Sequence, residues 1–163
     1  DISGEILLCP EGLSFWGGVD PETGTIIDIH HPCYQQNISG KILMMPSSRG
    51  SCSGSGVLLE LCLKNIAPAA IIFHEAEEIL SLGALVAERI FNKPIPIIKL
   101  KKQHYFILRK SSWATIHGNR LQTDIFDANY DCNLAYNRLT FHVYLKFNTH
   151  FLTSYSIGAL EKM

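Results

Sequence analysis

The chain of 163 residues contains no apolar run of the ~18–20 residues that a membrane-spanning helix requires. It also has almost no net charge: the formal value is -1 at pH 7, which gives no general attraction to nucleic acid or to an anionic membrane. Its composition, 47% hydrophobic and 18% charged, excludes a disordered chain. We therefore expect a soluble protein of about one domain, with neither nucleic acid nor membrane as a partner.

Paired-cysteine motifs are absent as well. The five cysteines, an odd number, form no C-x-x-C pair and show none of the spacings of a zinc site. This pattern favours reduced thiols in a cytoplasmic protein that holds no metal of its own. The chain begins with Asp1 and shows no secretory leader, so we expect a processed chain or a piece of a longer one.

Proline is missing from the last part of the chain. All seven prolines and ten of the twelve glycines lie in residues 1–100, whereas eleven of the sixteen aromatic residues lie in 101–163. The first part carries 6 basic and 11 acidic residues, a net charge of -5, and the second carries 8 and 4, a net charge of +4. Such a shift predicts a boundary near Leu100, with a domain at 1–100 and a poorly defined extension at 101–163.

Short apolar runs alternate with helical stripes in the first part, which predicts a compact α/β domain. Strands are predicted at Ile2–Cys9, Thr25–Ile29, Lys41–Met45, Ala69–Phe73 and Ile95–Leu100. Two helices are predicted, at Gly56–Lys64 with Val57, Leu58, Leu61 and Cys62 on one face, and at Ile79–Phe91 with Ile79, Leu82, Val86 and Ile90 on one face. In the extension, strands are predicted at His104–Leu108 and Thr140–Phe147.

A loop of serines and glycines, PSSRGSCSGSG at residues 46–56, joins the third of these strands to the first helix. Small residues let backbone amides approach a ligand, and the start of a helix favours negative charge. Arg49 adds a forked donor for a carboxylate or phosphate. The loop therefore predicts either an anion-binding site or, equally, a plain connection in which a serine caps the helix.

Known loop motifs fit this segment poorly. It has no lysine, which excludes a Walker A loop, and its final glycines lack the third glycine of a dinucleotide fingerprint. Residues 50–54, GSCSG, have the form of a nucleophile elbow with Cys52 in place of the serine, and His74 would be its base. This alternative is less favoured, because an α/β-hydrolase needs a larger sheet and a histidine later in the chain.

Several blocks between residues 3 and 100 occur in an order and spacing that resemble one family. They are LSFWGGVDPETG at 13–24, IID at 26–28, HHP at 30–32, GKIL at 40–43, RGS at 49–51, APAAII at 67–72 and LGALVAE at 82–88. Together they resemble the swivel domain of aconitase X, a branch of the aconitase superfamily. The resemblance implies an α/β fold of the swivelling β/β/α type and a role in a hydro-lyase.

The resemblance also implies a substrate class, a small hydroxy acid that loses water. Phe15-Trp16 and His30-His31-Pro32 are more similar to cis-3-hydroxy-L-proline dehydratases, and the small subunit of a mevalonate 5-phosphate dehydratase is the alternative. A third possibility, of another class, is a truncated binding module without catalysis.

Roles for individual residues follow from the same resemblance. In the family the serine after a Gly-Lys/Arg-Gly turn accepts the proton, and in this sequence that residue is Ser51. The expected substrate-binding residues are Arg49, Gly50, Ser53 and Ser55, and the expected cleft-shaping residues are Gly17, Gly18 and Asp20. The iron or iron–sulfur centre of the family is held by a large catalytic subunit or domain. We therefore expect such a partner, and no cofactor or metal on this chain.

Overall fold

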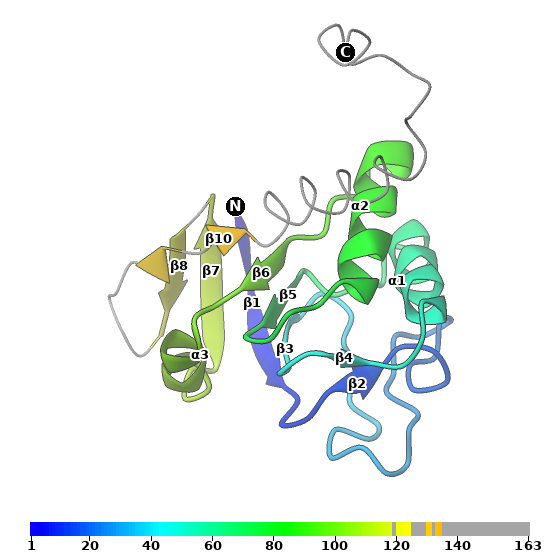
Figure 1. The fold of residues 1–163 in the computed structure, drawn as a ribbon, viewed down its shortest axis with the longest axis horizontal. Coiled ribbons are helices and arrows are strands. Elements are labelled where there is room, and N and C mark those ends of the chain that lie inside the picture. The colour runs from blue at the N-terminus through cyan, green and yellow to red at the C-terminus, as the bar shows by residue number, and fades with distance from the viewer. Residues whose placement is uncertain (119, 125–129, 132, 135–163) are drawn as a thin grey trace, which may run out of the picture.

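The structure, a computed structural model, describes residues 1–118, 120–124, 130–131 and 133–134 (Figure 1). Its helices are α1 (Ser53–Leu63), α2 (Ile79–Phe91) and α3 (Lys102–Leu108). Its strands are β1 (Ile2–Leu8), β2 (Leu13–Ser14), β3 (Ile42–Met44), β4 (Ser48–Arg49), β5 (Ala70–Phe73), β6 (Ile97–Lys99), β7 (Trp113–His117), β8 (Arg120–Thr123), β9 (Tyr130–Asp131) and β10 (Asn133–Leu134). Among the described residues, no helix combines the length and the apolar character needed to cross a bilayer.

The main sheet has the strand order β10-β6-β5-β3-β1-β7-β8-β9, and β2 and β4 form a separate pair. The four central strands, β1, β3, β5 and β6, run parallel, and β7 joins the outer side of β1 in antiparallel orientation. The connections from β3 to β5 and from β5 to β6 pass through α1 and α2. The prediction of an α/β fold is confirmed. Four of the five strands predicted in the first hundred residues are also confirmed, as β1, β3, β5 and β6.

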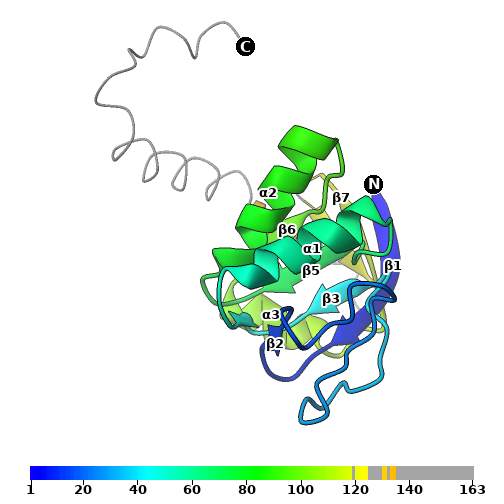
Figure 2. The same cartoon turned by 90° about the vertical axis from the view of Figure 1, so that its right-hand side faces the viewer.

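Side chains from the central strands alternate between two cores. On β3, Leu43 belongs to one core and Ile42 and Met44 to the other, and β5 divides its residues in the same way. Figure 2 shows α1 and α2 next to each other over one face of the sheet. The second core lies on the opposite face, where α3 contributes Tyr105 and Leu108. Because both faces are covered, these strands read in the sequence as short continuous apolar runs.

Helix α1 buries the four residues that were predicted to share its inner face. The predicted inner face of α2 is wrong: Ile90 is 69% exposed, and the buried residues of α2 are Leu80, Ser81, Gly83, Ala84 and Ala87. A Cβ atom on Gly83 would lie 2.6 Å from the backbone oxygen of Ser55, so the two helices approach very closely. Such an approach needs small residues at the contact, and apart from Leu80 the larger aliphatic side chains of α2 are only partly buried or are exposed.

The segment Thr25–Ile29 is not the strand that its β-branched residues predict. The backbone N–H of Ile26 donates to Gln36, whereas that of the next residue, Ile27, donates to Gly18. The segment pairs with two different neighbours through isolated bridges, so no continuous ladder forms. Its conformation is set by packing between two loops, which β-propensity does not describe.

The segment His104–Leu108 is also not a strand but most of α3. Tyr105 and Leu108, three positions apart, are buried, whereas Phe106 between them is exposed. Burial thus follows a helical turn, and the apolar run reflects one covered face of a short helix. The predicted strand at Thr140–Phe147 lies outside the described residues.

The sheet continues past Leu100, where composition predicts a boundary. Strand β7 pairs with β1, with Ala114 opposite Gly4 and Ile116 opposite Ile2. Ala114 and Ile116 are buried in the core that lies beneath β1. A unit that ended at Leu100 would leave one edge of β1 unpaired and this core open to solvent.

We expect a chain of residues 1–100 to be less stable than a chain of residues 1–124 by more than about 3 kcal/mol. The shorter chain loses the buried side chains of Leu108, Ile116 and Leu121, each worth about 1.5–3 kcal/mol. Urea unfolding of the two chains, followed by circular dichroism, measures the difference. Equal free energies of unfolding would support a domain that ends at Leu100.

Candidate functional site

The serine-glycine loop leaves the small sheet at β4 and enters α1. Strand β4 pairs in parallel with β2, with Arg49 opposite Ser14. Gly50 follows with a φ of +102°, and a Cβ atom there would lie 2.9 Å from the side-chain oxygen of Ser14. Only glycine satisfies both conditions. Gly50 therefore makes the turn that brings Ser51 to the surface.

Ser51 lies exposed directly before the first turn of α1. Its Oγ accepts one long hydrogen bond, 3.4 Å, from the backbone N–H of Ser53. Cys52 occupies the N-cap position and makes no side-chain capping bond. The hydroxyl of Ser51 thus stands in the positive field of the helix start and is only weakly engaged by it.

Arg49 extends from β4 beside this turn. Its guanidinium lies 3.6 Å from the carboxylate of Asp28, and the two side chains are 52% and 23% exposed. A partly exposed pair at this distance contributes little stability, so the guanidinium keeps donors for a second anion. Asp28 was not among the predicted site residues, although it lies within a block that carries the family resemblance.

Gly17 and Gly18 form the turn that follows β2. Gly17 has a φ of +73°, and a Cβ atom on Gly18 would lie only 2.1 Å from the backbone oxygen of Ser14. Ser14 also meets Gly50 from its other side, so the two glycine turns pack on the same short strand. The structure therefore brings Gly17 and Gly18 close to the Ser51 loop.

Asp20 has its carboxylate engaged in its own turn. It accepts hydrogen bonds from the backbone N–H of Glu22 at 3.0 Å and from the hydroxyl of Thr23 at 2.7 Å. These bonds hold the pKa of Asp20 below its usual value. Ser55 is similarly engaged, because its hydroxyl donates to the backbone oxygen of Cys52 at 2.6 Å. Both side chains serve local structure, whereas Ser53 is exposed on the first turn of α1.

Glu77 is a buried carboxylate that connects the serine loop to the start of α2. It accepts hydrogen bonds from the backbone N–H groups of Leu80 at 2.8 Å and Ser81 at 3.0 Å, in the first turn of α2. It also accepts one from the hydroxyl of Ser48 in β4, at 2.6 Å. The sequence gives no signal for Glu77, because three acidic residues, Glu75, Glu77 and Glu78, lie within four positions of one another at the start of α2. Only the fold distinguishes Glu77 from the other two.

The alternative pair of Cys52 and His74 does not form. The ring of His74 packs against Tyr105, with ring centroids 4.5 Å apart, and against Phe106 at 5.9 Å. Those residues belong to α3, on the face of the sheet opposite α1 (Figure 1). Cys52 lies at the start of α1, so the thiol has no base from this histidine.

The Ser51 loop does not fit an iron–sulfur centre. A cluster needs several convergent thiolates, and residues 46–56 contain only Cys52. Within the described part of the chain, three metal-ligating side chains do meet elsewhere: Cys9, His31 and Cys33. Their spacing along the sequence matches no known pattern, and only the fold brings them together.

Several known proteins are similar to this chain in sequence. The chain is 49% identical over 120 residues to the cis-3-hydroxy-L-proline dehydratase of Pseudomonas aeruginosa, which covers 74% of this chain and 20% of that protein. It is 46% identical over 84 residues to the phosphomevalonate dehydratase small subunit of Methanothermobacter thermautotrophicus, which covers 52% of this chain and 64% of that protein. The chain thus spans about a fifth of the first relative and about two thirds of the second.

A solved structure has the same fold. The crystal structure of aconitase X from Thermococcus kodakaraensis, in its holo-form, superposes with a TM-score of 0.54 at 42% identity, covering 60% of this chain and 70% of that chain. The family model described as the aconitase X swivel domain matches residues 1–125. The swivelling α/β fold implied by the sequence blocks is confirmed, and the chain belongs to the aconitase X swivel domain family.

Proposed function

We propose that this chain is the swivel component of a hydro-lyase and delivers Ser51 to a substrate held by a large aconitase X-type catalytic subunit or domain. The observation that carries the proposal is the exposed Ser51 hydroxyl, presented by the Gly50 turn at the start of α1 beside Arg49. The substrate would be a small hydroxy acid in the cytoplasm. Cis-3-hydroxy-L-proline is favoured because the Pseudomonas relative, at 49% identity, is named for it.

Dehydration of a hydroxy acid removes the proton next to the carboxylate and expels the hydroxyl from the neighbouring carbon. The electron pair of the broken C–H bond becomes the new double bond as the hydroxyl leaves. Ser51 Oγ would receive the proton. A serine hydroxyl is a weak base at neutral pH, so its alkoxide must be stabilised by a fixed field. The partial positive charge at the N-terminus of α1 and the guanidinium of Arg49 would provide that field.

Arg49 has a second use in this proposal, as the donor for the substrate carboxylate. Its guanidinium is planar and forked and can bind a carboxylate through two parallel hydrogen bonds. Asp28 lies at its other side and would keep the side chain directed along the loop. The substrate would then present its acidic C–H bond to Ser51.

The metal that assists departure of the hydroxyl would belong to the partner. The Ser51 loop offers a single thiol, so the iron or iron–sulfur centre of the family has no set of ligands there. This chain would contribute the proton acceptor and the hydrogen-bond donor that binds the substrate carboxylate. The catalytic subunit or domain would contribute the metal. Phosphomevalonate is the second candidate substrate, because the Methanothermobacter relative is a small subunit of that dehydratase.

A chimeric enzyme tests the proposal. Residues 1–125 of this chain replace the corresponding region of the Pseudomonas dehydratase, and dehydration of cis-3-hydroxy-L-proline is measured against the same enzyme with that region deleted. We expect the chimera to eliminate water and the deleted enzyme to be inactive. A folded chimera with no more activity than the deleted enzyme, on this substrate and on phosphomevalonate, would instead indicate a non-catalytic binding module.

A further inference from the structure

We propose that Cys9, His31 and Cys33 form a binding site for a borderline-soft divalent cation, and that Zn²⁺ is the ion that fits it. One ligand atom from each of the three side chains lies within 4.8 Å of the other two. All three residues are buried, with exposed fractions of 0%, 3% and 7%. Neither cysteine is in a disulfide, and the two come from different segments of the chain.

The three ligand types and their separations suit zinc. Zinc binds cysteine sulfur at about 2.3 Å and histidine nitrogen at about 2.0–2.1 Å, in tetrahedral geometry that separates the ligand atoms by about 3.4–3.8 Å. The cluster would therefore need to contract by at most about 1.4 Å to close on an ion. Three protein ligands leave the fourth tetrahedral position for a water molecule or a backbone oxygen.

His31 is held in an orientation that suits a metal ligand. The backbone N–H of Cys33 donates to Nδ1 at 3.1 Å, so Nδ1 carries a lone pair. The proton therefore lies on Nε2, which is 3.4 Å from the backbone oxygen of Glu11. Metal-binding histidines commonly direct their second ring nitrogen at a carbonyl in this way. On binding, the ion would replace the Cys33 amide at Nδ1.

Charge balance supports a metal site that is buried away from bulk solvent. Two thiolates neutralise a divalent cation, and the imidazole of His31 adds no charge. The loaded site would carry no net charge, which avoids the large penalty of burying an unpaired ion. A carboxylate ligand would add an unbalanced charge, and Cys9, His31 and Cys33 include none.

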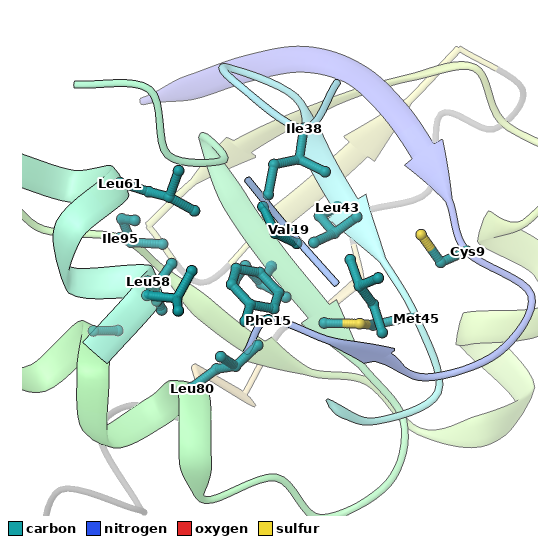
Figure 3. Packing of buried hydrophobic residues seen from close by; sticks show 14 of the residues in the cluster. Cys9, Phe15, Val19, Ile38, Leu43, Met45, Leu58, Leu61, Leu80 and Ile95 are labelled. Atoms are coloured by element: carbon teal, nitrogen blue, oxygen red, sulfur yellow. The ribbon is translucent and has the colours of Figure 1, made fainter. Parts of the chain in front are cut away.

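The site has a structural consequence for the serine loop. Cys9 follows β1 at the margin of the hydrophobic cluster, beyond Met45 in Figure 3. His31 and Cys33 lie in the loop that also carries Asp28, the partner of Arg49. A bound ion would tie this loop to the end of β1 and so hold Asp28 in place. The ion is proposed as a structural tie and not as the metal of the dehydration reaction.

Cobalt provides the test, because its spectrum reports thiolate ligands and tetrahedral geometry. The full chain is reduced, stripped of metal and titrated with Co²⁺ without oxygen. We expect thiolate-to-cobalt charge-transfer bands and strong tetrahedral d–d bands that saturate at one equivalent and disappear when Zn²⁺ is added. Cys33→Ser should weaken Zn²⁺ binding by at least about 10- to 100-fold, the loss that even an outer-sphere partner causes.

Cys62→Ser is the matched control, because it removes a sulfur that is also buried, at 3% exposure, but lies on α1. It should leave metal binding unchanged. Equal binding by wild type and Cys33→Ser would overturn the proposal, as would equal losses in both variants or the absence of any cobalt spectrum. A Cys9–Cys33 disulfide that persists under reducing conditions would overturn it as well.

A second measurement uses only the wild-type chain, in case Cys33→Ser does not fold. Zn²⁺ should slow alkylation of Cys9 and Cys33, mapped by mass spectrometry, and leave the rates at Cys52 and Cys62 unchanged. Alkylation rates at Cys9 and Cys33 that do not respond to Zn²⁺ would contradict the site. Neither measurement involves dehydratase activity, so the outcome is independent of the proposed function.

Discussion

Replacing Ser51 by alanine in the chimeric dehydratase is expected to lower kcat by about 10²–10⁴-fold, the usual contribution of a positioned general base. The KM should change little, because the lost group acts on the proton in the transition state and not on the bound substrate. The substitution should not disturb the fold, since the Ser51 hydroxyl makes only the long contact with the Ser53 amide. Steady-state kinetics of the purified chimera measure both constants.

Ser3→Ala is the control for this substitution. It removes the same hydroxyl group from an exposed serine on β1. The hydroxyl of Ser3 donates to Thr115 of β7 and not to any residue of the serine loop. Its kcat should equal that of the unmodified chimera. Arg49→Ala should raise KM and also lower kcat, because it removes both the donor proposed for the substrate carboxylate and part of the field proposed for the Ser51 alkoxide. An active Ser51→Ala chimera with unchanged kcat would reject the assignment of Ser51 as the proton acceptor.

Replacing Glu77 by alanine is expected to lower the free energy of unfolding by about 3–5 kcal/mol. The substitution leaves the Leu80 and Ser81 amides and the Ser48 hydroxyl without their acceptor, and each buried, unpaired polar group costs about 1–3 kcal/mol. Urea unfolding of the 163-residue chain measures the loss. In the chimera the same substitution should also lower kcat, because Ser48 precedes the turn that presents Ser51.

Glu78→Ala is the matched control, since Glu78 is the neighbouring carboxylate, is exposed and makes no capping bond. A surface substitution of this kind changes stability by about 0.5 kcal/mol or less. Glu77→Gln keeps an acceptor oxygen and should fall between the two. Equal losses for the Glu77 and Glu78 alanine variants would show that the buried hydrogen bonds of Glu77 do not anchor the loop.

Sequence patterns predicted the structure correctly where it depends on residues that are close together in the sequence. The strands β1, β3, β5 and β6 are short apolar runs because both of their faces are covered, and that pattern is visible in the sequence. The inner face of α1 followed from helical spacing. The Gly50 turn and Ser51 were identified by a block of residues that resembles the family, and the match over residues 1–125 confirms that family.

Sequence patterns failed where a residue's surroundings come from distant segments. Helix α2 turns its small residues inward because α1 passes within van der Waals contact of Gly83. Its own periodicity favoured the larger aliphatic residues instead. Helix α3 was mistaken for a strand because an isolated run of five residues has no period long enough to separate the two.

The amino-acid sequence by itself determined the α/β class, the family, and the serine loop at the start of α1, because these depend on local spacing and on ordered blocks of residues. Only the tertiary structure decided which polar side chains meet. Glu77 reaches Ser48 and the start of α2, Asp28 reaches Arg49, and Cys9 joins a loop more than twenty residues away. Contacts of this kind form when the helices and loops pack on the sheet, because packing brings together segments that are far apart in the sequence.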